Sequence, residues 1–287
     1  MNEVTVLGLG SMGSTIAKLL IASGRRVTVW NRTTEKARDF LDAGAQLATS
    51  VESAVLASPA IVMCVYDYQA AEEILNAPGV AAAIKNRVLV QLSTGSPEDA
   101  RRALAWASRH GAGYIDGAIQ AAPSQMGQPD TPILVSGSTA VFQDVESTLT
   151  SLGGNVIYLG EKIEAAATMD LATLSYVYGA FTGFLHGTRI AESEGLDVAR
   201  FGEIVKMISP SFGAFFQHEG KVIQSGDFTI TESPLRISVE AVRRILLASQ
   251  DAGINTQIPE LFTDLLDRAD AVGLGNQELA SVIKVLR

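Results

Sequence analysis

The stretch "VTVLGLGSMGSTIAKLLIASG", residues 4–24, joins a short apolar run, a glycine-rich turn and an amphipathic segment that ends at Gly24. The spacing Gly-x-Gly-x-x-Gly after a strand and before a helix is typical of a dinucleotide site. Its glycines let backbone amides approach a pyrophosphate at a helix N-terminus. We therefore predict a dinucleotide cofactor bound at Gly8, Leu9, Gly10, Ser11, Met12 and Gly13.

Short apolar runs continue to about residue 160 and alternate with Ala-rich amphipathic stretches. After the first strand they read "RVTVWN", "AIVMCV", "RVLVQLS", "GYIDGAI", "PILVSG" and "NVIYLG". Strands that alternate with helices indicate a mostly parallel, doubly wound sheet. The fold class predicted for residues 1–160 is therefore an α/β Rossmann domain.

The end of the second predicted strand selects the cofactor. NAD sites commonly carry Asp or Glu here for the ribose 2′-hydroxyl, but this chain has Asn31, Arg32, Thr33 and, one turn later, Lys36. Two cations in the first turn of a helix oppose its dipole, and a bound anion would account for them. These residues predict NADP(H), although Arg32 and Lys36 could instead be ordinary solvated side chains.

Two further residues complete the predicted cofactor set. Val65 ends the strand "AIVMCV", and Thr94 lies in "LSTGSPEDARRA", where Ser96 and Pro97 indicate a helix start. Ligands bind along the carboxyl edge of such sheets. Thr94 could therefore contact cofactor or substrate, or be a simple turn hydroxyl.

Residues 161–287 lose the strand pattern and predict a second, all-helical domain. Ser233-Pro234 and Pro259 begin helices that end before Gly253 and Gly273, and Asn276 caps a last one. A connecting helix over residues 163–194 would be about 48 Å long at 1.5 Å per residue, too long for its own domain to bury. Glycines recur on it at positions 179, 183 and 187. We therefore predict an intertwined homodimer formed through the helical domains.

One carboxylate, Asp170, stands alone on this long helix in an uncharged stretch that runs to Thr188. An unpaired carboxylate is costly to bury, because apolar neighbours cannot replace its hydration. Asp170 therefore faces solvent, has a partner or lines a site.

Composition excludes several classes of function. The net charge is −9, and the 22 Lys and Arg residues are scattered, which argues against nucleic-acid binding. The stretch 171–188 is too polar to span a membrane. The single Cys64 allows no internal disulfide, the three histidines show no metal-ligand spacing, and no signal peptide is evident, so we predict a cytoplasmic protein without a metal site.

Together these segments resemble the β-hydroxyacid dehydrogenase superfamily, which has a 6-phosphogluconate dehydrogenase-like fold, and most closely its imine reductase and reductive aminase branch. The resemblance covers essentially the whole chain. It is carried by "GLGSMG", "VWNRTTEK", "LSTGSPE", "AAPSQMGQP" and "DLATLSYVYGAFTGFLHG".

Two departures from the parent dehydrogenases bear on the reaction. Their D-A-P-V-S-G-G turn is replaced by "DGAIQAA", residues 116–122, and their K-x-x-N motif is replaced by Asp170 and Thr173. At the position of Asp170, an acid thus stands where the parent dehydrogenases have the cation that assists alcohol oxidation. Reduction of a C=N bond passes through a cationic iminium, which an acid can protonate or a carboxylate can stabilise. Both roles stay open for Asp170.

The resemblance also implies roles for other residues. It places Tyr178 beside the substrate in a catalytic or binding role, and Gln120 in the pocket. The reductive aminases have Asn at the position of Thr94 and a later Gln near Ser238, neither of which stands here. We therefore expect reduction of a preformed imine rather than condensation of a ketone with an amine.

The predicted function is NADPH-dependent reduction of imines to amines by hydride transfer, in a cleft between the subunits. The first alternative is a 3-hydroxyacid dehydrogenase-type oxidoreductase, which the missing lysine disfavours. The second is a non-catalytic NADP-binding sensor, for which the cofactor motif would look the same.

Overall fold

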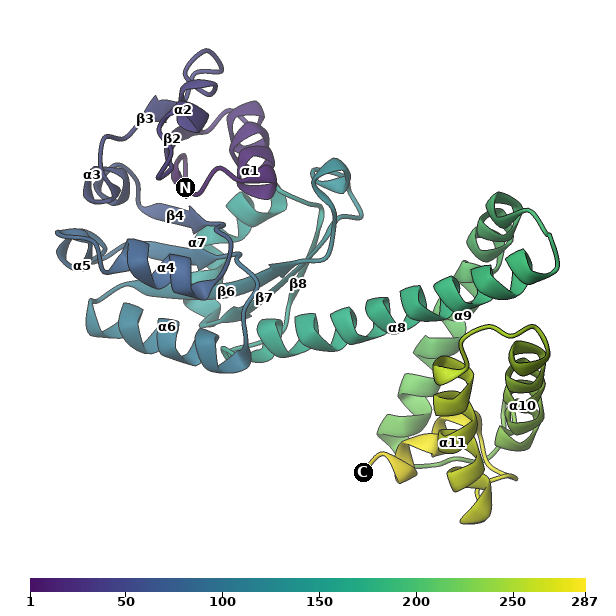
Figure 1. Ribbon diagram of the computed structural model, residues 1–287. Helices are drawn as coiled ribbons and strands as arrows, with labels where there is room; N and C mark the ends of the chain where they lie inside the picture. Colours follow the sequence, from purple (N-terminus) through teal and green to yellow (C-terminus); the bar gives the residue numbers. More distant parts are fainter. The chain divides into compact units, whose positions relative to one another are not determined.

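The computed structural model describes residues 1–287 as two compact units, Met1–Ser175 and Tyr176–Arg287 (Figure 1). The boundary between them falls inside the long helix α8, Ala165–Ser193, whereas the sequence places the domain boundary at residue 160. The difference arises because the first turns of α8 are fastened to the sheet of the first unit.

An eight-stranded sheet forms the centre of the first unit, in the order β3-β2-β1-β4-β5-β6-β7-β8. All neighbouring strands are parallel except β6 and β7, so the predicted mostly parallel, doubly wound sheet is confirmed. The two-residue strand β3 was not predicted. The strands are β1 Glu3–Leu7, β2 Arg26–Trp30, β3 Gln46–Leu47, β4 Ala60–Met63, β5 Val88–Gln91, β6 Gly113–Ile119, β7 Pro132–Gly137 and β8 Asn155–Tyr158.

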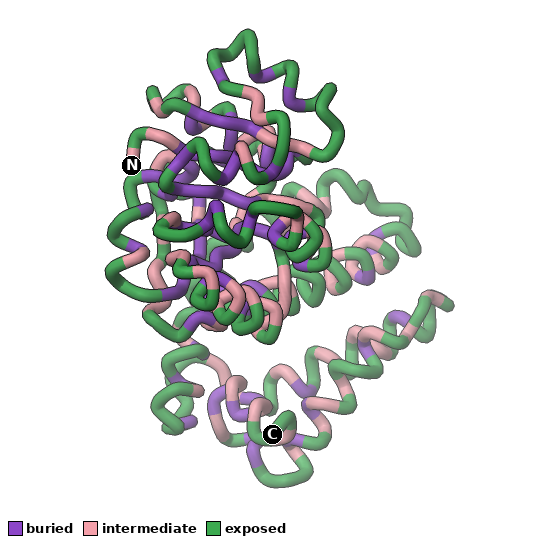
Figure 2. Tube along the Cα trace, turned by 90° about the vertical axis from the view of Figure 1, so that its left-hand side faces the viewer, coloured by how far each residue is buried: buried purple, intermediate pink, exposed green.

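Helices cover both faces of the sheet, and each face has its own apolar core. On one face Val4 and Val6 of β1 pack with Ile16 of α1 and Leu149 of α7, and on the other Leu7 packs in the layer of α3 to α6. The central strands β1, β4 and β5 are almost entirely buried as a result, whereas the edge strands β3 and β8 are partly exposed (Figure 2). The helices of this unit are α1 Ser11–Ala22, α2 Glu35–Arg38, α3 Val51–Leu56, α4 Tyr68–Leu75, α5 Val80–Ala83, α6 Pro97–Arg109, η1 Pro123–Gln125 and α7 Thr139–Thr150.

The helix start predicted at Ser96 and Pro97 is confirmed. The Ser96 hydroxyl accepts a hydrogen bond from the backbone N–H of Asp99, and the Asp99 carboxylate accepts one from the backbone N–H of Ser96. Two otherwise unpaired donors at the start of α6 are satisfied in this way.

Buried side chains of the sheet fix the start of α8. The Ser136 hydroxyl, on β7, donates to the carbonyl of Ile163 at 2.7 Å and accepts from the N–H of Ala166 at 3.0 Å. The N–H of Ala167 lies near the carboxyl of Asp116, on β6, and favours its ionised form. The first turn of α8, and with it the place of Asp170 in the first unit, is therefore held by β6 and β7.

The second unit contains the rest of α8 with α9 Val198–Ser225, α10 Leu235–Asp251, α11 Gln257–Ala271 and the 3₁₀ helix η2 Leu279–Val285. Its small core consists of Leu235, Val239, Leu266, Ala269 and Leu274. The two helices predicted after residue 233 are confirmed as α10 and α11. The last predicted helix is a 3₁₀ helix, and α9, which continues through Pro210, was not predicted.

No helix of the chain combines the length and the apolar character that crossing a membrane requires.

Candidate functional site

A cavity of about 690 Å³ lies at the carboxyl ends of β1, β2 and β4. Every predicted cofactor residue except Thr94 lines it. The lining residues are Gly8, Leu9, Gly10, Ser11, Met12, Gly13, Trp30, Asn31, Arg32, Thr33, Lys36, Val51, Cys64, Val65, Tyr66, Ala70, Glu73, Ile74 and Ala77.

The three glycines of the turn serve different purposes. Gly8 has φ +97°, and a Cβ there would lie 2.3 Å from the carbonyl oxygen of Cys64. A Cβ on Gly13 would lie 2.1 Å from the carbonyl oxygen of Gly8, so this glycine lets α1 approach β1. A Cβ on Gly10 would meet no atom within 4 Å. Gly10 is the N-cap of α1, and the open space beside it fits the pyrophosphate of a dinucleotide.

The end of β2 is tied to the glycine turn through Asn31. Its side-chain oxygen accepts from the N–H of Leu9 at 3.0 Å, and its amide nitrogen donates to the carbonyl of Thr33 at 3.0 Å. Each end of the Asn31 amide therefore has one partner within the chain, and these two bonds hold the side chain at the cavity wall. Arg32 is exposed, with a single long ion pair to Glu73 at 3.9 Å, so its charge is available to a 2′-phosphate.

Val65 and Thr94 lie in different environments. The N–H of Val65 donates to the Ser93 hydroxyl at 2.9 Å, which holds the end of β4 at the cavity wall. Thr94 is exposed and does not line the cavity. Burial raises the pKa of the neighbouring Cys64 thiol to about 11, so this thiol is un-ionised at neutral pH and a poor nucleophile.

Several cavity residues were missed by sequence reasoning, among them Trp30, Tyr66 and Glu73. Trp30 and Tyr66 lie at or just beyond the ends of β2 and β4, where the rule that ligands bind at the carboxyl edge could have found them. Glu73 belongs to α4, and only the tertiary fold brings it to the cavity.

Asp170 is buried, with 6% of its surface exposed, and it has a partner. The side-chain amide of Gln120 lies 2.6 Å from its carboxylate, and the Thr173 hydroxyl lies 2.7 Å from the side-chain oxygen of Gln120 and 2.9 Å from the backbone carbonyl oxygen of Asp170. Burial raises the pKa of Asp170, and the amide donor of Gln120 opposes that rise. The lone acid of the long helix is therefore held inside a hydrogen-bonded group.

Tyr178 lies two turns further along α8, in the second unit, and 66% of its surface is exposed. Its backbone carbonyl accepts from the hydroxyl of Thr182. Within one chain, therefore, the fold brings Gln120 into contact with Asp170, whereas Tyr178 is exposed on α8.

Asp116 is a second buried carboxyl. The sequence marks it only as the first residue of "DGAIQAA". It is 2% exposed, and the hydroxyls of Tyr68 and Tyr114 both donate to it. Burial raises the pKa of Asp116 to about 7, against these donors and the N–H of Ala167, and the charge of Asp170 adds to the rise. The two phenol oxygens are themselves 3.0 Å apart. The two phenol protons can serve only two of these three contacts; when Asp116 is protonated it supplies the third proton, and one phenol then donates to the other rather than to Asp116.

Asp116→Asn is expected to flatten the pH dependence of stability. A carboxyl whose pKa rises from 3.8 to about 7 on folding binds a proton in the folded state that the unfolded chain releases, so stability falls as pH rises from about 4 to 7. Between pH 5 and 8 this amounts to about 2–3 kcal/mol, at 1.36 kcal/mol per pKa unit. Urea unfolding of both proteins at the two pH values measures it, and parallel pH profiles would contradict it.

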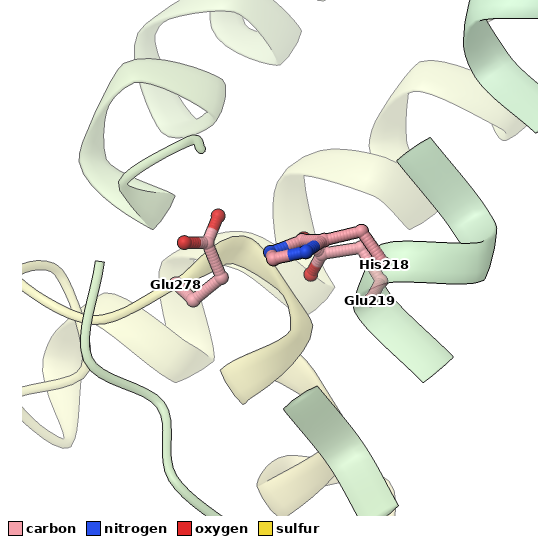
Figure 3. Close-up of side chains that lie close together, drawn as sticks. All are labelled: His218, Glu219 and Glu278. Carbon is pink, nitrogen blue, oxygen red and sulfur yellow. The ribbon is translucent and has the colours of Figure 1, made fainter. Parts of the chain in front are cut away.

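In the second unit the side chains of His218, Glu219 and Glu278 point toward one another (Figure 3). The carboxylate of Glu278 accepts hydrogen bonds from the N–H groups of residues 231–233. Although burial opposes ionisation, these donors lower the pKa of Glu278 to about 2. Glu219 accepts from the N–H of Ala280 at 2.7 Å. The cluster thus fastens the loop before α10 to α9 and η2, with the Glu278 oxygens engaged by backbone donors.

Two family models match the chain over most of its length. The NAD-binding domain of 6-phosphogluconate dehydrogenase matches residues 3–160, and the C-terminal domain of NADPH-dependent reductive aminase-like proteins matches residues 163–287.

Relatives and solved structures agree with these models. An NADPH-dependent reductive aminase of Aspergillus oryzae is 32% identical, over 100% of this chain and 97% of its own. An imine reductase from Myxococcus stipitatus in complex with NADP+ superposes with a TM-score of 0.92 at 31% identity, covering 99% of this chain and 100% of its own. A reductive aminase from Aspergillus terreus, with NADPH4, cyclohexanone and allyl amine, gives 0.90 at 33% identity over 100% and 99%. The chain therefore belongs to the family of NADPH-dependent reductive aminases and imine reductases, NADP(H)-using oxidoreductases that act on C=N bonds.

Proposed function

We propose that this chain reduces preformed imines to amines, with Asp170 as the residue that meets the substrate's nitrogen. The observation that carries the proposal is the buried, hydrogen-bonded acid on α8 at the position where the parent dehydrogenases have a lysine. An anionic or acidic group matches the cationic iminium, just as a cation matches a developing alkoxide. A relative from Aspergillus terreus has been solved with NADPH4 and dibenz[c,e]azepine.

The cofactor, when bound, supplies a hydride to the iminium carbon. The new C–H bond displaces the C=N π pair onto nitrogen, and the product leaves as an amine. In this proposal Asp170 holds the nitrogen end of the substrate, and Tyr178 contacts the substrate through its ring or hydroxyl. Exposure of Tyr178 at 66% in the single chain leaves its ring free for such a contact.

In this proposal Arg32 and Lys36 bind the 2′-phosphate of NADPH. We expect Arg32→Ala to weaken NADPH binding by about tenfold or more and NADH binding much less, because only NADPH carries the anion that the guanidinium meets. Fluorescence titration of both cofactors measures the ratio. An equal loss for both would remove Arg32 from the 2′-phosphate site.

A homodimer is part of the proposal, with the reaction in a cleft between subunits. Support comes from large apolar side chains that the second unit leaves exposed, including Phe181, Leu185, Met207 and Phe212. Gly179 and Gly183 have open space beside them, whereas a Cβ on Gly187 would meet Phe201 of α9 at 2.8 Å. A second copy of the chain is the occupant proposed for this surface, and a monomeric mass at micromolar concentration would refute it.

The location of the protein is proposed to be the cytoplasm. The one cysteine, Cys64, is a free thiol, as is usual in a reducing compartment. Cell fractionation of the native protein tests this.

The test of function compares two substrate classes under one set of conditions. NADPH oxidation is followed with 2-methylpyrroline, and NADP+ reduction is followed with a panel of β-hydroxy acids. Turnover of the imine alone is expected. Turnover of a hydroxy acid alone would return the chain to dehydrogenase chemistry, with another group in place of the missing lysine.

A further inference from the structure

A second cavity, of about 340 Å³, adjoins the cofactor cavity at the start of α1. The two cavities share residues 9–11 of the glycine turn and Lys36 of α2. The other residues that line the second cavity are Ser14, Lys18, Asp39 and Phe40. A group carried by a cofactor in the first cavity can therefore extend into the second, between α1 and the segment that contains α2.

The second cavity contains two lysines that have no ionic partner in the chain. Lys18 belongs to α1 and Lys36 to α2, and neither is ion-paired, although Asp39 lines the same cavity. Two cations against one anion make this cavity positive, in a chain whose net charge is −9. Like charges that face one cavity repel each other, and an anion bound between them removes that repulsion.

Polar residues of α1 form one face beside this cavity. Ser11, Ser14 and Lys18 follow one another at spacings of three and four residues, so they share one side of the helix. Side chains of a helix lean toward its N-terminus. The long side chain of Lys18 therefore extends back toward the two serines and toward Gly10, the N-cap where the first cavity begins.

The 2′-phosphate is the group of NADP(H) that fits this cavity. The pyrophosphate fits the open space at Gly10, and in sites of this fold the ribose that carries the 2′-phosphate lies beyond the end of the second strand. Lys36 follows that strand and lines both cavities, so a phosphate within its reach also borders the second cavity. A phosphate monoester has three acceptor oxygens and close to two negative charges, which several cations can share.

We propose that Lys18 is a further specificity-determining residue for NADP(H), which binds the 2′-phosphate together with Lys36, and that Asp39 weakens this binding by its negative charge. The inference rests on the proposed function, which places the 2′-phosphate at Arg32 and Lys36. It extends the phosphate site from the loop after β2 onto α1. The preference for NADP(H) over NAD(H) then depends on a helix that the loop sequence does not include.

Lys18→Met should weaken NADPH binding about fivefold, the upper range for an exposed ion pair, and should leave NADH binding unchanged. Methionine keeps an unbranched apolar side chain, and Lys18 is exposed, so the fold should be unaffected. Lys18→Arg keeps the charge and should bind NADPH nearly as wild type does. Fluorescence titration of both cofactors measures the ratio. No loss, or an equal loss for NADPH and NADH, would overturn the assignment of Lys18.

Asp39→Asn should change the ratio in the opposite direction. Loss of the one anion in the cavity is expected to strengthen NADPH binding about twofold and to leave NADH binding unchanged. Unchanged or weaker NADPH binding would contradict the role of Asp39. Lys85→Met and Asp42→Asn are matched controls for the change in net charge, because both residues are exposed and line neither cavity. Both controls should keep the wild-type ratio.

Two small nucleotides keep this inference separate from the proposed function. Adenosine 2′,5′-bisphosphate and adenosine 5′-phosphate differ only in the 2′-phosphate, and calorimetry with either needs no imine and no turnover. Lys18→Met should weaken binding of the bisphosphate alone, by a factor that shrinks as salt rises from about 0.05 M to about 0.5 M. If no imine is reduced, the proposed function fails and this titration still tests Lys18. Equal bisphosphate affinity in wild type and Lys18→Met would overturn the inference and leave imine reduction untouched.

Discussion

Asp170→Asn is expected to lower kcat/KM for a cyclic imine by about 10²- to 10³-fold, the range seen when one preorganised electrostatic partner of a transition state is lost. Asparagine has nearly the shape of aspartate, and its side-chain oxygen can still accept from the amide of Gln120. The substitution therefore removes the charge and little else. Steady-state kinetics with the same imine measure the effect.

Two further measurements tell this loss from damage to the fold. NADPH affinity should be unchanged, because Asp170 does not line the cofactor cavity. Thermal stability should be equal or slightly higher, because a carboxylate that is costly to bury is replaced by a neutral group. Asp144→Asn, on the exposed face of α7, is a control for loss of one negative charge. Near wild-type turnover of Asp170→Asn would remove the acid from the mechanism.

Patterns that are local in sequence predicted the first unit well. The glycine turn, the strands before and after it and the helix start at Ser96 depend on residues within a few positions of one another. The two-residue strand β3 has no pattern of its own, since its place is set by pairing with β2. The helix α9 was missed because Pro210 indicates a helix break, and the structure carries it inside the helix.

The candidate site was predictable only in part. Sequence and resemblance pointed to Asp170 and Gln120 separately, but the bond between them joins residues fifty positions apart. No sequence pattern indicated that Asp116 is buried and hydrogen-bonded. Its neighbours come from three different elements, with Tyr68 in α4, Tyr114 in β6 and Ala167 in α8. The two compact units divide inside α8, whereas the family models divide at the predicted boundary, because buried side chains of the sheet hold the first turns of α8.

The second large effect is expected when either of two glycines of the cofactor turn is changed to alanine. One change should impair both folding and cofactor binding, and the other cofactor binding alone. In Gly13→Ala the new Cβ would lie 2.1 Å from the carbonyl oxygen of Gly8, a backbone atom that cannot move without separating α1 from β1. We expect the free energy of unfolding to fall by about 3 kcal/mol, at the upper end of overpacking costs, and cofactor binding to be lost with the geometry of the turn.

Gly10→Ala should leave the fold intact and still remove cofactor binding. Its φ of −69° is ordinary for alanine, and its Cβ would meet no atom within 4 Å. The modest loss at an N-cap is offset by the smaller entropy of the unfolded chain. The new methyl group would occupy the open space beside the N-terminus of α1, where the pyrophosphate must approach the backbone amides. We expect NADPH affinity to fall about 100-fold, equal to about 2.8 kcal/mol.

Calorimetric melting and NADPH titration of both variants distinguish these outcomes. A stable Gly10→Ala protein without affinity for NADPH, beside a destabilised Gly13→Ala protein, would show that one glycine makes room for the cofactor and the other for the helix. If Gly10→Ala bound NADPH as wild type does, the cofactor would have to lie away from the N-terminus of α1. The assignment of the 690 Å³ cavity as the cofactor site would then fail, whatever the stability of either variant.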